Sequence, residues 1–131
     1  MERQVINPWK WQDQFGFVQA NEIRAPERTL ISSGQTSVDD DGRPLHPGDM
    51  AAQMNKALDN LETVLQSASM GLADVVKLQY YTTDVDAWIQ SAPAWMSRLA
   101  EAGCRPTSTL LGVARLAFPE LLVEVEATAV A

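Results

Sequence analysis

Two glutamates near the C-terminus are the residues best placed to do chemistry. Glu124 and Glu126 stand two positions apart in LLVEVEATAV, a segment that predicts a β-strand. Their side chains then point the same way, roughly 7 Å apart. A carboxylate in an otherwise apolar strand is costly unless it has a partner or water, and it can orient a water molecule or act as an acid or base. The pattern is equally compatible with two hydrated or salt-bridged edge carboxylates.

The other reactive residue types stand alone. Cys104 is the only cysteine and His46 the only histidine, and they are far apart in the sequence. A thiolate nucleophile needs a neighbouring base or positive field, and a metal site needs several ligands at suitable spacing. We therefore interpret Cys104 as structural and His46 as a loop residue, and we expect neither a metal nor a cofactor. The acidic run 39–42 (DDDG) lacks the ligand spacing of a calcium loop and predicts a tight turn.

Composition narrows the class of protein further. The chain has 131 residues, of which 46% are hydrophobic and 21% charged, which predicts one globular domain over residues 1–131. Its net charge of −7 and the lack of a Lys/Arg run argue against a nucleic-acid partner. We see no apolar signal segment and no stretch long enough to span a membrane, and a lone cysteine suits a reducing compartment. We thus expect a cytoplasmic protein with a small-molecule ligand and no membrane partner.

A helix after residue 49 is the clearest element that could position such residues. Asp49 is a suitable N-cap, and Gly71 is placed to end the helix in a left-handed conformation. Apolar residues recur every three or four positions, which puts them on one face. They are Met54, Ala57, Leu58, Leu61, Val64, Leu65 and Ala68.

The remaining pattern predicts strands around a second helix. Pro93 suggests that this helix begins at Ser91, with Trp95, Met96 and Leu99 buried and Gly103 ending it. Residues 1–13 show no periodicity and predict an irregular arm. The expected strands are 15–20 with Ile23, 28–33, 75–83, 107–116 and 121–130, the last two separated by a short turn at 119–120. This order favours an α+β fold with two helices on one face of a mixed sheet.

The last strand predicts a two-sided sheet. Val123, Val125, Ala127 and Ala129 share the face that can meet the helices, while Leu122, Glu124, Glu126 and Thr128 share the other. We place Leu110 and Leu116 on this second face as well. Because so many apolar side chains cannot all stay hydrated, we expect copies of the chain to associate through that face.

Several segments together resemble the reactive-intermediate-deaminase (Rid, YjgF-type) family, in a divergent subgroup. They are SGQTSVD at 33–39, AAQMNKALDNLETVLQSAS at 51–69, DVVKLQYYTTDVD at 74–86 and the C-terminal RPTSTLLGVARL and LLVEVEATAV. The resemblance covers about residues 14–131. It implies a chorismate-mutase-like, ferredoxin-like sheet of about six strands, a barrel-like homotrimer, and small-molecule clefts between subunits. It also implies hydrolysis of reactive enamines and imines without a cofactor.

At the family's functional positions, this sequence matches the family at some residues and differs from it at others. The family's backbone-binding glycine matches Gly34 and its water-positioning glutamate matches Glu124. Its carboxylate-binding arginine falls at Ser108, its first-strand tyrosine at Phe17 and its helix asparagine at Ala92. The resemblance therefore implies a water site without the usual guanidinium clamp. The expected cleft comprises Phe17, Ser33, Gly34, Ser108, Thr109 and Glu124, with Glu124 catalytic and the others binding substrate.

Two arginines lie near the position of the missing clamp and could replace it. Arg105 lies three residues before Ser108 and is the better candidate, although a surface role suits it equally. Arg115 is expected to face away from Ser108.

Three functions remain open. The first is a hydrolase acting on an enamine or imine other than the usual 2-iminopropionate type. The second is a non-enzymatic, trimeric metabolite-binding protein. The least favoured is a ribonuclease or translation inhibitor, because the chain is acidic and has no His/Lys pair.

Overall fold

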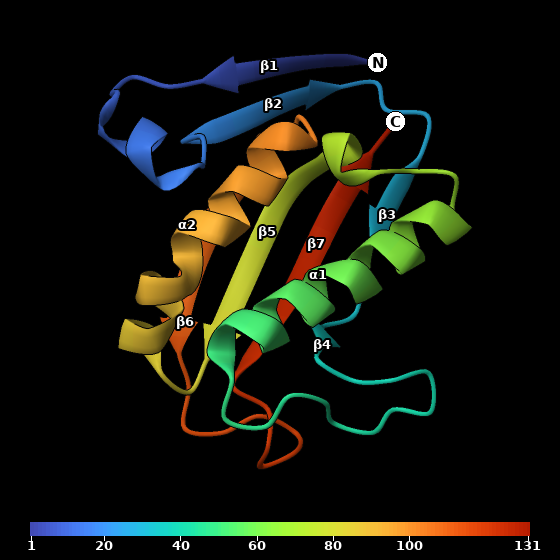
Figure 1. The fold of residues 1–131 in the computed structure, drawn as a ribbon. Coiled ribbons are helices and arrows are strands. Elements are labelled where there is room, and N and C mark those ends of the chain that lie inside the picture. The colour runs from blue at the N-terminus through green and yellow to red at the C-terminus, as the bar shows by residue number, and fades with distance from the viewer.

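The computed structural model describes residues 1–131, and it confirms an α+β fold with both helices on one face of a mixed sheet (Figure 1). The helices are α1 (Met50–Ser67) and α2 (Val85–Glu101), with short 3-10 helices η1 (Trp11–Phe15) and η2 (Leu72–Asp74). The strands are β1 (Glu2–Ile6), β2 (Ala20–Arg24), β3 (Thr29–Ile31), β4 (Gln35–Thr36), β5 (Val75–Thr82), β6 (Thr107–Gly112) and β7 (Val123–Val130). Neither helix is long and apolar enough to cross a membrane.

The main sheet has five strands, in the order β3-β7-β5-β6, and β4 also pairs with β7. Only β5 and β6 run parallel; the other pairs in this sheet are antiparallel. β1 and β2 form a separate antiparallel ribbon. The central strands β5 and β7 therefore have pairing partners on both sides, and their register fixes which of their side chains lie on each face.

Helix α1 begins where the sequence predicts. The Asp49 carboxylate accepts the Ala52 N–H at 3.0 Å. Its end differs, however, because Ser69, with a φ of +57°, takes the left-handed position expected for Gly71. The N–H groups of Ser69 and Met70 donate to Gln66 and Leu65 and close the last turn.

Helix α2 begins six residues earlier than predicted, at Val85 rather than Ser91. The Asp84 side chain caps it by accepting the Ala87 N–H at 3.0 Å, and Pro93 lies inside the helix on its exposed side. The four buried positions on α2 recur at spacings of three and four on both sides of the proline, so burial of this face offsets the missing hydrogen bond. They are Trp88, Ala92, Trp95 and Leu99. Gly103, with a φ of +70°, ends the helix as expected.

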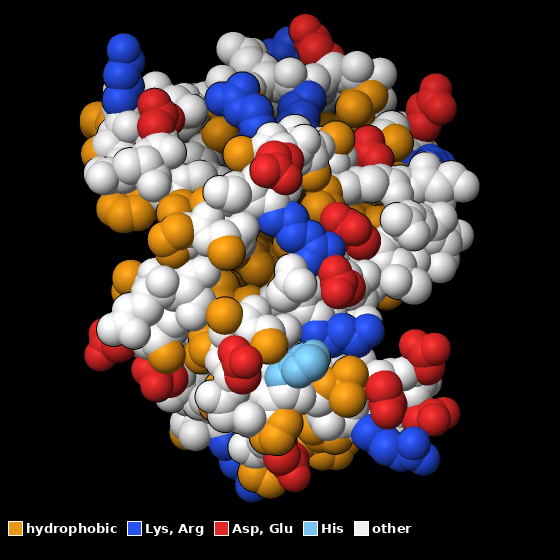
Figure 2. Space-filling model, viewed as in Figure 1, with side chains coloured by type: hydrophobic (Ala, Val, Ile, Leu, Met, Phe, Trp, Pro, Cys, Tyr) orange, Lys and Arg blue, Asp and Glu red, His pale blue; other side chains and the backbone are white.

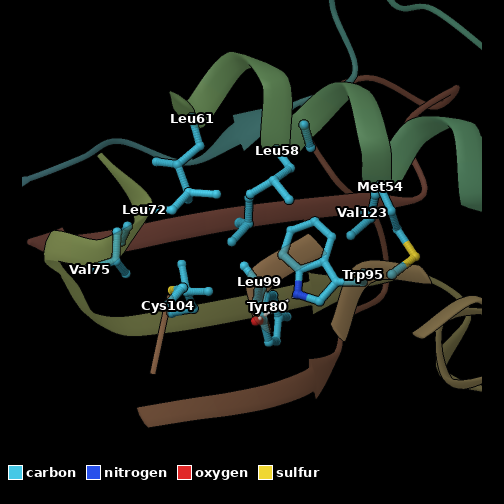
Figure 3. Packing of buried hydrophobic residues seen from close by; sticks show 14 of the residues in the cluster. Met54, Leu58, Leu61, Leu72, Val75, Tyr80, Trp95, Leu99, Cys104 and Val123 are labelled. Carbon is cyan, nitrogen blue, oxygen red and sulfur yellow. Dashed lines mark hydrogen bonds between the residues drawn. The ribbon is translucent and has the colours of Figure 1, made fainter. Parts of the chain in front are cut away.

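The core lies between the two helices and the β5–β7 pair. Figure 3 shows Met54, Leu58 and Leu61 of α1 directed toward the sheet. One polar contact lies within this core: the Trp95 indole N–H donates to the Tyr80 hydroxyl at 3.0 Å. Burial raises the pKa of Tyr80 well above its usual value, so this hydroxyl stays neutral.

The N-terminal arm is not irregular as expected. Residues 2–6 form β1, and its partner β2 spans 20–24, whereas residues 15–20, expected to be a strand, mostly do not form one. The Arg3 guanidinium holds the ribbon to the main body by donating to the carbonyls of Val75 and Arg105, at 3.4 and 2.7 Å. Because these contacts join residues that are far apart in the sequence, the residues of the arm themselves show no pattern that predicts a strand.

The two C-terminal strands are not a hairpin. β6 ends at Gly112, β7 begins at Val123, and β5 lies between them, so residues 113–122 cross an end of the sheet. Arg115 is consequently an exposed loop residue rather than part of a strand. Leu110 pairs with Tyr80 and faces the helices, not the opposite face on which we placed it. Leu116, which we also placed on the opposite face, lies in the loop after β6 and is not part of the sheet.

Candidate functional site

Glu124 lies on the face of the sheet that no helix covers, which we call the open face. It pairs with Tyr81 of β5, and the next pair on this face joins Gln79 to Glu126. The Tyr81 hydroxyl donates to Glu126 Oε1 at 2.7 Å, which fixes that carboxylate beside Glu124. The two glutamates therefore share one face as predicted, and one of them has a strong hydrogen-bond partner.

The environment of Glu124 favours its protonated form. Partial burial raises the pKa of this carboxyl, and the negative charge of Glu126 raises it further. A carboxylate whose pKa lies above the usual value is a better proton acceptor near neutral pH. The geometry thus suits Glu124 to accept a proton from a water molecule.

A bulge brings Gly34 against the Glu124 side chain. Ile31 pairs with Thr128 and Gln35 with Val125, so four steps on this edge oppose three on β7. The extra residue interrupts the ladder at residues 33–34, after Ser32, whose N–H still donates to the Ala127 carbonyl at 3.0 Å. A Cβ on Gly34 would lie only 2.8 Å from Cγ of Glu124. Any larger side chain at residue 34 would therefore displace the Glu124 side chain, whereas the φ of Gly34, which is not positive, does not itself call for glycine.

A separate cavity of about 460 Å³ lies on the other side of the sheet, between the N-terminal segment, α2 and β6. We call it the α2 cavity. It is bounded by Phe17, Trp88, Ala92, Met96, Ser108 and Leu110, among others. Figure 2 shows hydrophobic side chains gathered around a notch between η1 and α2 on this face. No Lys, Arg, His, Asp or Glu lines the cavity.

The predicted site residues thus fall into separate groups within one chain. Glu124 and Gly34 meet on the open face, next to the exposed Ser33. Phe17 and Ser108 meet in the α2 cavity. Thr109 is also on the open face, where it pairs with Gln79 of β5. It belongs to the edge strand β6, however, and β5 separates it from β7 and Glu124.

Arg105 does not reach the α2 cavity. Its side chain is exposed and lines a neighbouring cavity of about 330 Å³, which shares Gly16, Phe17 and Met96 with the α2 cavity but not Ser108. Its backbone carbonyl accepts hydrogen bonds from Arg3 and Asn21 and is held in place. The position therefore does not favour Arg105 as a substitute for the clamp at residue 108.

The isolated reactive residues behave as structural ones. Cys104 is buried, and burial raises the pKa of its thiol to about 12, so it is not a thiolate at neutral pH. His46 is exposed in the loop before α1. No three His, Cys, Asp or Glu side chains are grouped so that they could hold a metal ion.

Two residues of these sites escaped sequence reasoning. The sequence predicts Tyr81 only as part of a strand, although the alternation of Lys77, Gln79 and Tyr81 with Leu78 and Tyr80 places it on the glutamate face. Trp88 lies before the helix start that Pro93 suggests, so the sequence analysis does not include it. The Asp84 capping position, four residues before Trp88, was the signal that could have revealed it.

A known protein family matches this chain. The family model described as endoribonuclease L-PSP matches residues 14–131. The chain is 28% identical over 102 residues to the 2-iminobutanoate/2-iminopropanoate deaminase of Escherichia coli, a match covering 77% of this chain and 78% of that protein.

Solved structures match over a similar or greater span. A structure of the Rid-family protein YyfB from Yersinia pestis has a TM-score of 0.90 and 36% identity, covering 100% of both chains. The structure of E. coli TdcF with bound serine has a TM-score of 0.71 and 25% identity, covering 88% of this chain and 87% of that one.

Proposed function

The chain belongs to the endoribonuclease L-PSP family, which includes the YjgF and Rid proteins, and from this we propose that it hydrolyses a reactive imine or enamine in a cleft between neighbouring subunits of a homotrimer. The E. coli relative is named for deaminase activity on 2-iminobutanoate and 2-iminopropanoate. For this chain the proposed substrate lacks the carboxylate of those compounds.

The separation of the predicted site residues across the sheet supports a shared site. Glu124 and Gly34 are on the open face, whereas Phe17, Ala92 and Ser108 line the α2 cavity on the helix side. Side chains on opposite faces of one sheet cannot meet around a small molecule. If all five positions contact one substrate, as the family resemblance implies, then a second copy must supply one of the two groups.

The open face has the surface that such contact needs. Ile31 is 79% exposed and Leu111 is 43% exposed, on the two edge strands that flank the glutamates. Association of copies through this face would remove both apolar side chains from water. Association through this face would also bury Glu124 further and strengthen its role as a proton acceptor.

The proposed reaction adds water across the C=N bond. Glu124 accepts one proton from water while the water oxygen bonds to the imine carbon, and it passes that proton to the nitrogen as the double bond becomes single. The C–N bond of the resulting amino alcohol then breaks as the hydroxyl proton moves through Glu124 to the amine nitrogen, releasing ammonia and leaving a carbonyl group, so that C=NH and H₂O yield C=O and NH₃. The Gly34 N–H is proposed to bind the substrate beside Glu124, and the Ser33, Ser108 and Thr109 hydroxyls to contribute to positioning.

The missing cation gives the first test. We expect 2-iminopropanoate, formed from freshly generated 2-aminoacrylate, to be hydrolysed about tenfold to a hundredfold more slowly than by the E. coli deaminase, because no guanidinium pairs with its carboxylate. An uncharged ketimine should release ammonia clearly faster with the protein than in buffer. Ammonia release in a coupled assay measures both. Equal rates on 2-iminopropanoate for the two proteins would contradict the argument from Ser108.

Gly34→Ala provides a second test, of the contact with Glu124. The added methyl group collides with the glutamate side chain, which must rotate away, and a displacement of about 1 Å at a reacting group lowers a rate on the order of a hundredfold. Because the φ of Gly34 is not positive, the thermal unfolding midpoint should hardly change. Gly71→Ala is the matched control, since its Cβ would meet nothing within 4 Å. An unchanged rate in Gly34→Ala would show that the present Glu124 position is not needed.

A binding protein without turnover is the second candidate, and the absence of a charged anchor in the α2 cavity favours it. Glu124→Ala separates the two, because a binder keeps its ligand affinity and has no turnover to lose. Ribonuclease activity is not supported by a net charge of −7 or by two adjacent glutamates on the open face.

A further inference from the structure

The α2 cavity differs from a carboxylate site in both charge and shape. Ten of the fourteen residues around it are hydrophobic, and none has a formal charge at neutral pH. Tyr80 is the one acidic hydroxyl there; burial raises its pKa and keeps it neutral, and its oxygen accepts the Trp95 N–H. A carboxylate placed in this cavity would be buried without a cation, which is strongly unfavourable.

The size of the cavity is well above that of a methyl or ethyl group. An apolar cavity of about 150 Å³ is enough to hold benzene, so about 460 Å³ leaves room for an aromatic ring and its substituents. The rings of Tyr80 and Trp88 line the cavity with their centroids 5.0 Å apart. Phe17 adds a further aromatic ring to the lining, and Met96 adds a thioether sulfur. Such surfaces favour a flat apolar group.

One polar group at this cavity has no partner. The Trp88 side chain is only 9% exposed, and its indole N–H is buried without a hydrogen-bond acceptor. A buried donor left unpaired costs about 1–3 kcal/mol. Because Trp88 borders the cavity, a small shift of its side chain would let a lone pair on a ligand remove that penalty. An indole N–H can only donate, which again selects an acceptor atom and not a cationic group.

We infer that the α2 cavity binds the aromatic ring of an uncharged imine or enamine, with an acceptor atom of the substrate near Trp88. This inference rests on the proposed function, because it places the C=N carbon at the mouth of the cavity, facing Glu124 of a neighbouring copy. The substrate class is therefore an aryl ketimine, or the enamine that interconverts with it, and not an imino acid.

The kinetic test compares three N–H imines generated in the assay: the imine of acetophenone, the imine of acetone, and 2-iminopropanoate. Burying a phenyl ring in place of a methyl group should raise kcat/KM by about tenfold to a hundredfold for the acetophenone imine over the acetone imine. 2-Iminopropanoate should be the poorest of the three. Equal kcat/KM for the two uncharged imines would overturn the inference.

Ala92→Phe tests the location of the ring. Ala92 is 8% exposed and borders the cavity, so the new ring occupies the space proposed for the substrate. The ratio of kcat/KM for the aryl over the methyl imine should fall toward one. Ala100→Phe adds the same group at an exposed position by the neighbouring cavity and should keep the parent ratio. A ratio unchanged in Ala92→Phe would place the ring elsewhere.

Direct binding separates this inference from the deaminase proposal. Acetophenone is unreactive here and has the same ring and a carbonyl acceptor, while benzoate adds a charge. Quenching of tryptophan fluorescence in the unmodified protein should show acetophenone binding at least about tenfold more tightly than benzoate. Acetophenone binding without turnover of any imine would retain the cavity assignment and refute the deaminase. Turnover of an imine with no preference for acetophenone over benzoate would refute the cavity assignment and retain the deaminase proposal.

Discussion

Glu124→Gln is expected to lower the rate of imine hydrolysis by about a hundredfold to ten-thousandfold, because the glutamine cannot accept a proton from water. In the parent protein the rate should fall as the pH drops through the pKa of Glu124, since only the carboxylate is a base. That pKa is raised above 4.5 by burial and by Glu126, so the fall begins at a higher pH than for an ordinary glutamate. Ammonia release measured across pH gives both results.

Glu126→Gln is the matched variant for this profile. It keeps the size of the side chain and removes the neighbouring charge that raises the pKa of Glu124. The fall in rate with decreasing pH should therefore begin at a lower pH than in the parent protein, and the rate should still fall as the pH decreases. A limb that stays in place would assign the titration to another group. A Glu124→Gln variant with the parent rate would remove Glu124 from the mechanism.

Stability provides a check that Glu124→Gln is still folded. A carboxyl with a raised pKa in the folded state binds its proton more tightly there than in the unfolded chain. Its stabilising contribution is full below the unfolded pKa and is lost as the pH rises through the folded pKa. The neutral glutamine avoids this loss, so the variant should be at least as stable as the parent at pH 7 in thermal unfolding.

Two inactive variants are expected to restore activity when they are mixed. Ala92→Phe blocks the α2 cavity and Glu124→Gln removes the base, and each alone should hydrolyse the acetophenone imine poorly. In randomly mixed homotrimers, a site formed between copies can draw its cavity from one variant and its glutamate from the other. About one quarter of all sites are then intact, so activity should approach about a quarter of the parent value.

The mixing experiment needs proof that subunits exchange. Dissociation and reassociation of differently tagged variants, followed by native mass spectrometry, measures the fraction of mixed trimers, and each variant treated alone is the control. Restored activity supports a site shared between copies. Mixed trimers without restored activity would place the whole site inside one chain, and light scattering that reports only the 14.4 kDa protomer would remove the trimer itself.

The elements that the sequence determined are those with local causes. The start of α1 follows from the Asp49 cap and from apolar residues spaced by three and four along 18 residues. The two faces of β7 follow from the alternation over Val123–Ala129, which puts Glu124 and Glu126 together whatever the rest of the chain does. Gly103 ends α2 because a left-handed residue is needed there and glycine adopts it without strain.

Tertiary structure decided the features that depend on distant contacts. Helix α2 begins before the position that Pro93 suggests, because burial of Trp88 against Tyr80 outweighs the local effect of the proline. β1 forms because Arg3 and Asn21 reach carbonyl groups more than fifty residues away. β5 separates β6 from β7, and the parallel register of β6 turns Ser108 toward the helices.

The same long-range pairing divides the candidate site. A residue's face within its own strand can be read from alternation, but strand order and register fix which faces of different strands coincide. Ser108 and Glu124 could therefore be named from the sequence, while their location on opposite sides of one sheet could not. That location depends on the pairing of β7 with β5 across more than forty residues of sequence and of β6 with β5 across thirty, which no local pattern encodes.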